Sequence, residues 1–122
     1  MDKLSRKYTT KNFRVIYRRD AFQEILNNRE YDRCWGIDFA ALIEANGNVI
    51  PCNLFHQKKR HVYGSINGEK FSQIWKSNRR KKVADKIRKE GSTRCRRACR
   101  LNFINKYLNK VKNKNIEHLN FI

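Results

Sequence analysis

The chain has 122 residues, with 29 basic against 11 acidic side chains and a net charge of +18 at pH 7. This length suits one domain with a modest hydrophobic core, which a bound metal or cluster would help to stabilise. No stretch approaches the roughly 20 apolar residues of a membrane span, and residues 1–7 lack the apolar core of a secretory signal. We therefore expect a cytoplasmic protein with no membrane segment. In that reducing compartment, four cysteines favour metal ligands over disulfides.

The first 30 residues carry weak structural signals. Residues 1–12 are polar and show no apolar period, so they resemble a linker or the tail of a preceding domain. Residues 13–18 alternate loosely and are rich in β-forming side chains, which predicts a short strand. Asp20 predicts the cap of a short helix that ends near Leu26. We expect residues 1–30 to be such a linker or tail, with one strand and one helix.

The pair Asn46-Gly47 lies between two apolar runs and predicts a β-hairpin. A two-residue type I′ turn needs positive φ at both central residues, which glycine adopts freely and asparagine tolerates. The run 37–43 alternates and predicts the first strand. Asp38 and Glu44 are expected at solvated strand ends.

The two cysteines that bracket this hairpin cannot meet along a straight strand. With the turn centred on Asn46-Gly47, Cys52 lies opposite Ala41. Cys34 lies seven residues before Ala41, or roughly 23 Å along an extended strand. Both thiols can share one centre only if the chain bends back, and Gly36 is the obvious position.

The second half of the chain predicts helices. Apolar residues recur at helical spacing and predict one helix, or a short and a longer one, from Phe71 to about Lys89. Gly91 can terminate it. A further apolar stripe predicts a final helix and consists of Leu101, Ile104, Tyr107, Leu108 and Val111. The expected fold class is α+β, a small β-hairpin followed by helices, with the four cysteines converging on one metal-cluster site.

The candidate metal ligands are Cys34, Cys52, Cys95 and Cys99, which read Cys-x17-Cys and, 42 residues later, Cys-x3-Cys. Structural zinc sites usually pair ligands two to four residues apart, and only the second pair fits. Iron–sulfur clusters also take thiolates and can draw them from more separated segments. Spacing alone leaves zinc and a cluster equally open. His56, the nearest other ligand type, is expected at the surface.

Positive charge surrounds the second cysteine pair. Such charge favours thiolates and would offset the negative charge of a thiolate-bound cluster. The basic residues are Arg94, Arg96, Arg97 and Arg100.

Several motifs follow one another from Tyr31 onward. They are Cys34-x12-Gly47-x4-Cys52, EANGNVIPC at 44–52, YGSIN at 63–67, FSQIWKS at 71–77 and Cys95-x3-Cys99. Together they resemble the SPASM or twitch domain found at the carboxyl end of radical S-adenosylmethionine enzymes. That family has the signature Cys-x9–15-Gly-x4-Cys and elements written NGdVypC, YGNi and f.eIW.S. The resemblance assigns residues 31–122 to such a domain, and the ending at 118–122 is also similar to that of some relatives.

The resemblance implies an auxiliary [4Fe-4S] cluster held by Cys34, Cys52, Cys95 and Cys99. Such a cluster assists the binding of a substrate, here expected to be a peptide, or carries electrons. The implied partner is a radical S-adenosylmethionine barrel, in the same parent chain or separate.

Two departures from the family pattern limit what the resemblance implies. Full SPASM domains carry Cys-x2-Cys-x5-Cys-x3-Cys and two clusters, whereas only Cys95 and Cys99 stand here, enough for one cluster. The catalytic Cys-x3-Cys-x2-Cys motif is absent as well. No radical chemistry can be assigned to this chain alone, so whether it is an enzyme stays open.

The net charge supports a second hypothesis, a zinc-stapled basic module that binds nucleic acid. Its basic runs lie near residues 58–60, 79–82 and 94–100. A third interpretation is a small basic scaffold with inert cysteines. The chain contains no Gly-x4-Gly-Lys-[Ser/Thr] phosphate loop and no His-Glu-x-x-His motif.

Overall fold

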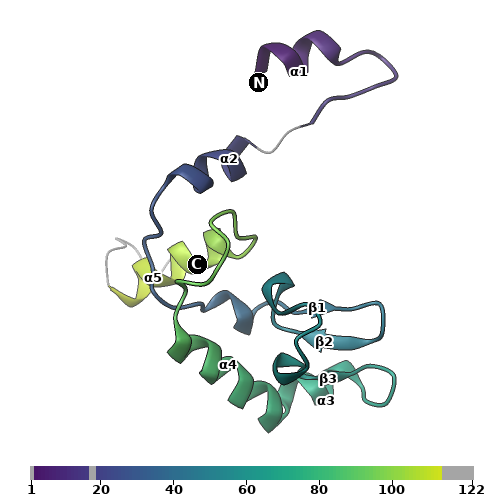
Figure 1. The fold of residues 1–122 in the computed structure, drawn as a ribbon, viewed down its shortest axis with the longest axis vertical. Coiled ribbons are helices and arrows are strands. Elements are labelled where there is room, and N and C mark those ends of the chain that lie inside the picture. The colour runs from purple at the N-terminus through teal and green to yellow at the C-terminus, as the bar shows by residue number, and fades with distance from the viewer. Residues whose placement is uncertain (1, 17–18, 114–122) are drawn as a thin grey trace.

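The computed structural model describes residues 2–16 and 19–113 and has the α+β architecture that the sequence predicts (Figure 1). The helices are α1 (Asp2–Tyr8), α2 (Arg19–Leu26), α3 (Phe71–Lys76), α4 (Asn78–Glu90) and α5 (Asn102–Lys112). The strands are β1 (Leu42–Ile43), β2 (Asn48–Ile50) and β3 (Gly64–Ser65). Within the described residues, none of these helices has the length and apolar character needed to cross a bilayer.

The hairpin forms around Asn46-Gly47, but the predicted type I′ turn is wrong. β1 and β2 pair antiparallel with Ile43 opposite Val49, which leaves a loop longer than two residues. The N–H of Gly47 donates to the carbonyl of Glu44 at 2.9 Å, and Gly47 alone in this turn has positive φ, +82°. A turn followed by one left-handed glycine is the common solution for a three-residue hairpin loop. β3 then pairs with β2, so β2 is the central strand.

The run 37–41 does not form the predicted strand. Gly36–Asp38 make one 3-10 turn instead, and β1 begins only at Leu42. The apolar residues of the predicted strand do not share one buried face, because Ile37 is fully buried while Phe39 is 67% exposed. The chain therefore does bend back at Gly36, where the sequence required a bend.

The amino-terminal segment contains the predicted helix as α2 but lacks the predicted strand. Residues 13–16 are irregular, and residues 17–18 lie outside the described part of the chain. α1 forms where a linker without structure was expected, and none of its residues is buried. The family-like ending at 118–122 also lies outside the described residues.

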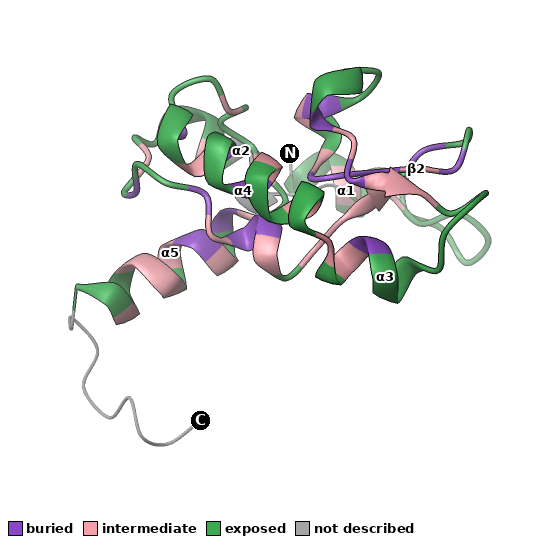
Figure 2. Ribbon diagram, turned by 90° about the horizontal axis from the view of Figure 1, so that it is seen from below, coloured by how far each residue is buried: buried purple, intermediate pink, exposed green. Residues whose placement is uncertain are grey.

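The helical region divides into two helices at Ser77, one of the two predicted arrangements. The Ser77 hydroxyl accepts the Arg80 N–H at 3.1 Å and so caps α4. Gly91, with φ of +75°, follows the last residue of α4, as predicted. Figure 2 shows that most of α3 and α4 is exposed, with few buried positions.

Two hydrophobic clusters lie against these helices and share Val83 of α4. One comprises Val49, Tyr63 and Ile74. The other comprises Cys34, Ile37, Phe55, Ala84 and Ile87, with Cys52 packed against it. The same apolar core thus holds the first two cysteines, although they come from different segments.

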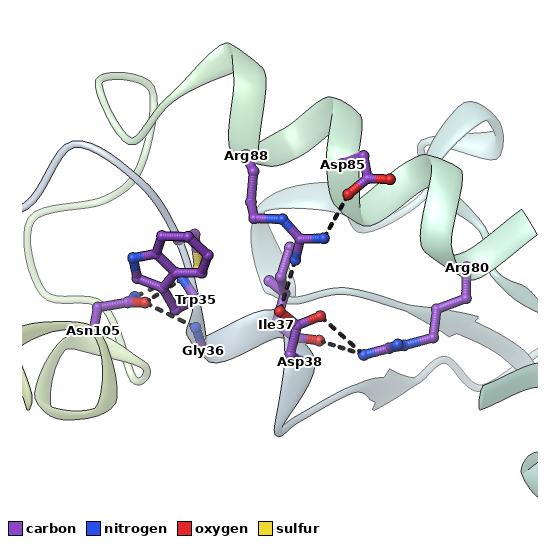
Figure 3. A network of polar contacts seen from close by, with 9 residues as sticks. Trp35, Gly36, Ile37, Asp38, Arg80, Asp85, Arg88 and Asn105 are labelled. Atoms are coloured by element: carbon purple, nitrogen blue, oxygen red, sulfur yellow. Dashed lines mark hydrogen bonds and ion pairs between the residues drawn. The ribbon is translucent and has the colours of Figure 1, made fainter. Parts of the chain in front are cut away.

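Asp38 connects the turn that follows Cys34 to α4 (Figure 3). The prediction that Asp38 lies at a solvated strand end is therefore wrong. Its carboxylate accepts from Arg80 at 3.2 Å and from Arg88 at 2.7 Å. The Arg80 side chain is only 12% exposed and lies over the ring of Trp75, 3.9 Å from the centroid. Two charge-assisted contacts with buried or half-buried partners therefore hold this turn in place.

Glu44 connects the hairpin to the segment that follows Cys52, and it too is buried, contrary to prediction. Its carboxylate accepts the backbone N–H of Gln57 at 2.8 Å and contacts His56 Nδ1 at 2.7 Å. The Gln57 N–H is the main reason that the pKa of Glu44 lies below its ordinary value of 4.5. Ionised Glu44 thus stabilises the folded chain.

We expect Asp38→Ala to lower the free energy of unfolding by about 1–2 kcal/mol, because two partly buried ion pairs are lost. Chemical denaturation measures this difference. Asp32→Ala is the matched control, since the Asp32 carboxylate is 85% exposed and lies 3.9 Å from Arg33. Equal stability of the two variants would show that the Asp38 contacts contribute nothing.

We expect Glu44→Gln to reduce the dependence of stability on pH in the acid range. The folded pKa of Glu44 is lower than the unfolded one, so its stabilisation is complete above the unfolded pKa. That stabilisation disappears as the pH falls through the folded pKa. Denaturation curves of wild type and variant should therefore differ at pH 7 and approach each other below about pH 4. A constant difference across this range would contradict the assignment.

Candidate metal centre

The four cysteines lie in three segments, and those that carry Cys34 and Cys52 pack in one cluster with Ala84 and Ile87 of α4. Cys34 is buried just before the 3-10 turn, and Cys52 directly follows β2 and Pro51. Cys95 and Cys99 lie in the loop between α4 and α5. All four are free thiols.

The thiols are close enough for their charges to influence one another. The pKa of Cys52 is raised to about 11, mainly by burial and in smaller part by thiolate charge on Cys99, Cys34 and Cys95. Burial is also the main cause of the raised pKa values of Cys95 and Cys99, and Cys34 contributes to both. The four side chains therefore share one electrostatic neighbourhood.

This neighbourhood does not have the geometry of a single-ion site. Among residues 2–16 and 19–113, no group of three or more His, Cys, Asp or Glu side chains is arranged to hold a metal ion. The convergence of all four sulfurs on one centre thus stays a prediction. His56 lies at the surface as expected, with its side chain 54% exposed.

Each of the four sulfurs faces an N–H donor. The Cys34 sulfur accepts from the Asn105 side-chain amide at 3.5 Å, and the Cys99 sulfur accepts from the backbone N–H of Leu101 at 3.4 Å. The backbone N–H of Leu54 donates to Cys52, and the Arg29 side chain donates to Cys95. N–H groups directed at sulfur stabilise thiolates and adjust the potential of iron–sulfur clusters. This donor set fits such a cluster.

The arginine that acts on these thiols is Arg29, which the sequence did not reveal. Its charge lowers the pKa of Cys95 and Cys99 but does not outweigh burial. The neighbouring arginines that sequence spacing favoured are not among the main influences on the two thiols. Positive charge thus favours the thiolates, as expected, although it comes from Arg29, and burial raises the pKa of both groups more strongly.

Arg29 also fixes the loop that carries Cys95. Its guanidinium donates to the carbonyls of Ser92 and Arg96, the latter at 2.6 Å. Ser92 donates two further hydrogen bonds, from its N–H to the carbonyl of Asp32 at 2.6 Å and from its hydroxyl to the carbonyl of Tyr31 at 2.9 Å. The segment before Cys34 and the loop before Cys95 are therefore joined by hydrogen bonds.

The segment after Cys34 is joined to the start of α5 in the same way. A Cβ on Gly36 would lie 2.9 Å from the Cβ of Leu101, so only glycine permits this close approach. Asn105 Oδ1 accepts the backbone N–H groups of Trp35 and Gly36 at 2.7 and 2.8 Å (Figure 3). Cys34 is thereby held beside the helix that begins three residues after Cys99.

Three asparagines of α5 make hydrogen bonds with residues 30–36. They lie outside the apolar stripe that predicted this helix. Asn102 and Asn105 are the buried residues of this helix. Asn102 Oδ1 accepts the Tyr31 hydroxyl at 2.9 Å, and Asn109 donates to the carbonyl of Glu30 at 3.0 Å. The three asparagines recur at helical spacing and so share one face of the helix. A search for apolar periodicity does not detect such a polar face.

A polar hollow of about 730 Å³ opens beside Cys95. It lies between the segment 24–32, the loop before Cys95 and α5, and its lining includes Tyr31, Ser92, Asn102 and Lys106. Burial raises the pKa of Tyr31 to about 12, so at physiological pH its hydroxyl keeps the proton that it donates to Asn102 Oδ1.

The comparison with known families agrees with this arrangement. The sequence model of SPASM, described as an iron-sulfur cluster-binding domain, matches residues 34–100, more than half of the chain. The matched range begins at Cys34, ends directly after Cys99 and so includes all four cysteines. Neither the curated proteins nor the solved structures contain a significant match. The chain therefore belongs to the SPASM family of iron–sulfur cluster-binding domains.

Proposed function

We propose that this chain binds one [4Fe-4S] cluster through Cys34, Cys52, Cys95 and Cys99 and serves as the auxiliary centre of a radical S-adenosylmethionine enzyme. The observation that carries the proposal is the shared neighbourhood of four free thiols, each with its own N–H donor. A family described as binding iron–sulfur clusters supports the same assignment.

A cluster is a better candidate for these thiols than zinc. Four thiolates around one zinc ion must each lie about 2.3 Å from it, which requires close convergence. A cubane of four irons offers one iron to each thiolate and therefore accepts sulfurs that lie farther apart. The family match, which is described as an iron-sulfur cluster-binding domain, supports the larger centre.

The role of the bound cluster would be to transfer electrons or to help hold a substrate. The residues around it do the binding and positioning. Arg29 and Asn105 orient the ligand loops, and the burial of Cys34 and partial burial of Cys52 limit access of water. The hollow beside Cys95 supports a substrate with many hydrogen-bonding groups, such as a peptide.

The proposed partner is a radical S-adenosylmethionine barrel, in the same parent chain or separate. Apolar side chains in the segment before residue 17 support a contact with another protein surface, because all are more than half exposed; they are Leu4, Tyr8, Phe13 and Ile16. Residues 1–30 would then be the linker or tail next to the barrel, and residues 31–122 the cluster-binding domain.

Anaerobic reconstitution with iron and sulfide should give protein with about four irons and four sulfides per chain. Alanine at any one of Cys34, Cys52, Cys95 or Cys99 should reduce the bound iron or change the visible spectrum, because one iron loses its thiolate. Iron and acid-labile sulfide assays measure this outcome.

His56→Ala is the control for these variants, since His56 is the nearest other ligand type and lies at the surface. This variant should bind as much iron and sulfide as the wild-type protein does. Wild-type protein that takes up one zinc and refuses iron would contradict the proposal and favour the zinc-stapled basic module. Binding of RNA that weakens steeply with salt would then be the next observation expected.

A further inference from the structure

Asn105 is the buried side chain that makes the most specific contacts with a proposed cluster ligand. It is 1% exposed and lies in α5, beyond the range 34–100 that the family match covers. Its oxygen accepts two backbone N–H groups, those of Trp35 and Gly36, while its nitrogen donates to the Cys34 sulfur. One side chain therefore fixes both the backbone after Cys34 and the environment of its thiol.

The orientation of this amide follows from chemistry. A backbone N–H can only donate, so the two N–H groups of Trp35 and Gly36 require an oxygen opposite them. Rotating the amide would place its NH2 group against two donors and leave the buried oxygen facing sulfur. The group that faces Cys34 must therefore be an N–H donor.

A hydrogen-bond chain supports the amide from its other side. The Tyr31 hydroxyl, which also contacts the Asn105 side chain, donates to Asn102 Oδ1 at 2.9 Å. Asn102 Nδ2 in turn donates to Glu24 at 2.7 Å. With oxygen and nitrogen both engaged, the Asn105 amide has little freedom to turn away from the sulfur.

We infer that Asn105 is a positioning residue that raises the reduction potential of the cluster, an inference that rests on the proposed function. Reduction adds an electron and increases the negative charge on the ligand sulfurs. An N–H dipole with its positive end at the Cys34 sulfur stabilises that charge more in the reduced state than in the oxidised state. The effect is strong because Asn105 and Cys34 are both buried, where water screens little.

Among the four donors, Asn105 is the one that a substitution can isolate. Leu54 and Leu101 donate through the backbone, which no side-chain change removes. Arg29 carries a charge and also joins two loops, so its replacement would change several properties at once. Asn105 also joins two segments, but Asn105→Asp keeps the oxygen that binds Trp35 and Gly36; it removes the donor to the Cys34 sulfur and adds a charge.

The test is the midpoint potential of the reconstituted cluster in Asn105→Asp, measured by anaerobic redox titration. Aspartate keeps an oxygen for Trp35 and Gly36 but replaces the N–H donor with a second oxygen. The potential should shift to a more negative value than in wild type. Asn109→Asp is the matched control, because Asn109 lies on the same helical face and donates to the carbonyl of Glu30, not to sulfur. It should keep the wild-type potential.

The outcomes separate this inference from the proposed function. Equal potentials in wild type and Asn105→Asp would overturn the inference and leave the cluster assignment intact. An equal shift in Asn109→Asp would also overturn it, since added charge alone would then explain the change. Wild-type protein that binds no cluster would overturn both.

A second measurement needs no variant at position 105. Wild-type protein with 15N only in its asparagine side-chain amides should show a 15N coupling in pulsed electron paramagnetic resonance of the reduced cluster. The coupling should persist in labelled Asn109→Asp. Its absence in wild type would overturn the inference even if Asn105→Asp failed to fold.

Discussion

The close contact between the segment after Cys34 and the start of α5 is the constraint on which the rest of the site depends. Gly36 lies against Leu101 without room for a side chain, and Asn105 binds the two N–H groups beside it. Through this contact the segment that carries Cys34 is held against Leu101, two residues after Cys99. Cys52 packs in the same cluster as Cys34, and hydrogen bonds from Arg29 hold the loop that carries Cys95.

Polar contacts, more than apolar ones, join the segments that carry the cysteines. A chain with few apolar residues cannot build a large core, and here two small clusters meet at Val83. Arg29, Asp38 and Glu44 each connect a loop to a distant segment through directed hydrogen bonds. Such bonds fix orientation as well as proximity, which a multi-ligand centre requires.

Local features of this fold could be predicted from the sequence, whereas contacts between distant segments could not. The Asn46-Gly47 hairpin, the break near Ser77 and the end of α4 at Gly91 depend on a few adjacent residues. The run 37–43 was misinterpreted because its apolar alternation does not follow burial: Ile37 is buried in a 3-10 turn, whereas Phe39 and Ile43 are exposed. Two acidic residues predicted at solvated strand ends instead make long-range contacts.

The candidate site shows the same division. Cysteine spacing and the family signature identified the thiols, and the family match includes them. Arg29 and Asn105 carry no sequence signal, because their partners are 60 or more residues away in the chain. The raised pKa values of the thiols likewise depend on burial, which the spacing of the cysteines cannot reveal.

The most direct test of the central claim is the iron anomalous density in crystals of the anaerobically loaded protein. One compact density in contact with the sulfurs of Cys34, Cys52, Cys95 and Cys99 is the predicted result, whereas iron bound elsewhere, or bound by fewer of these sulfurs, would contradict it.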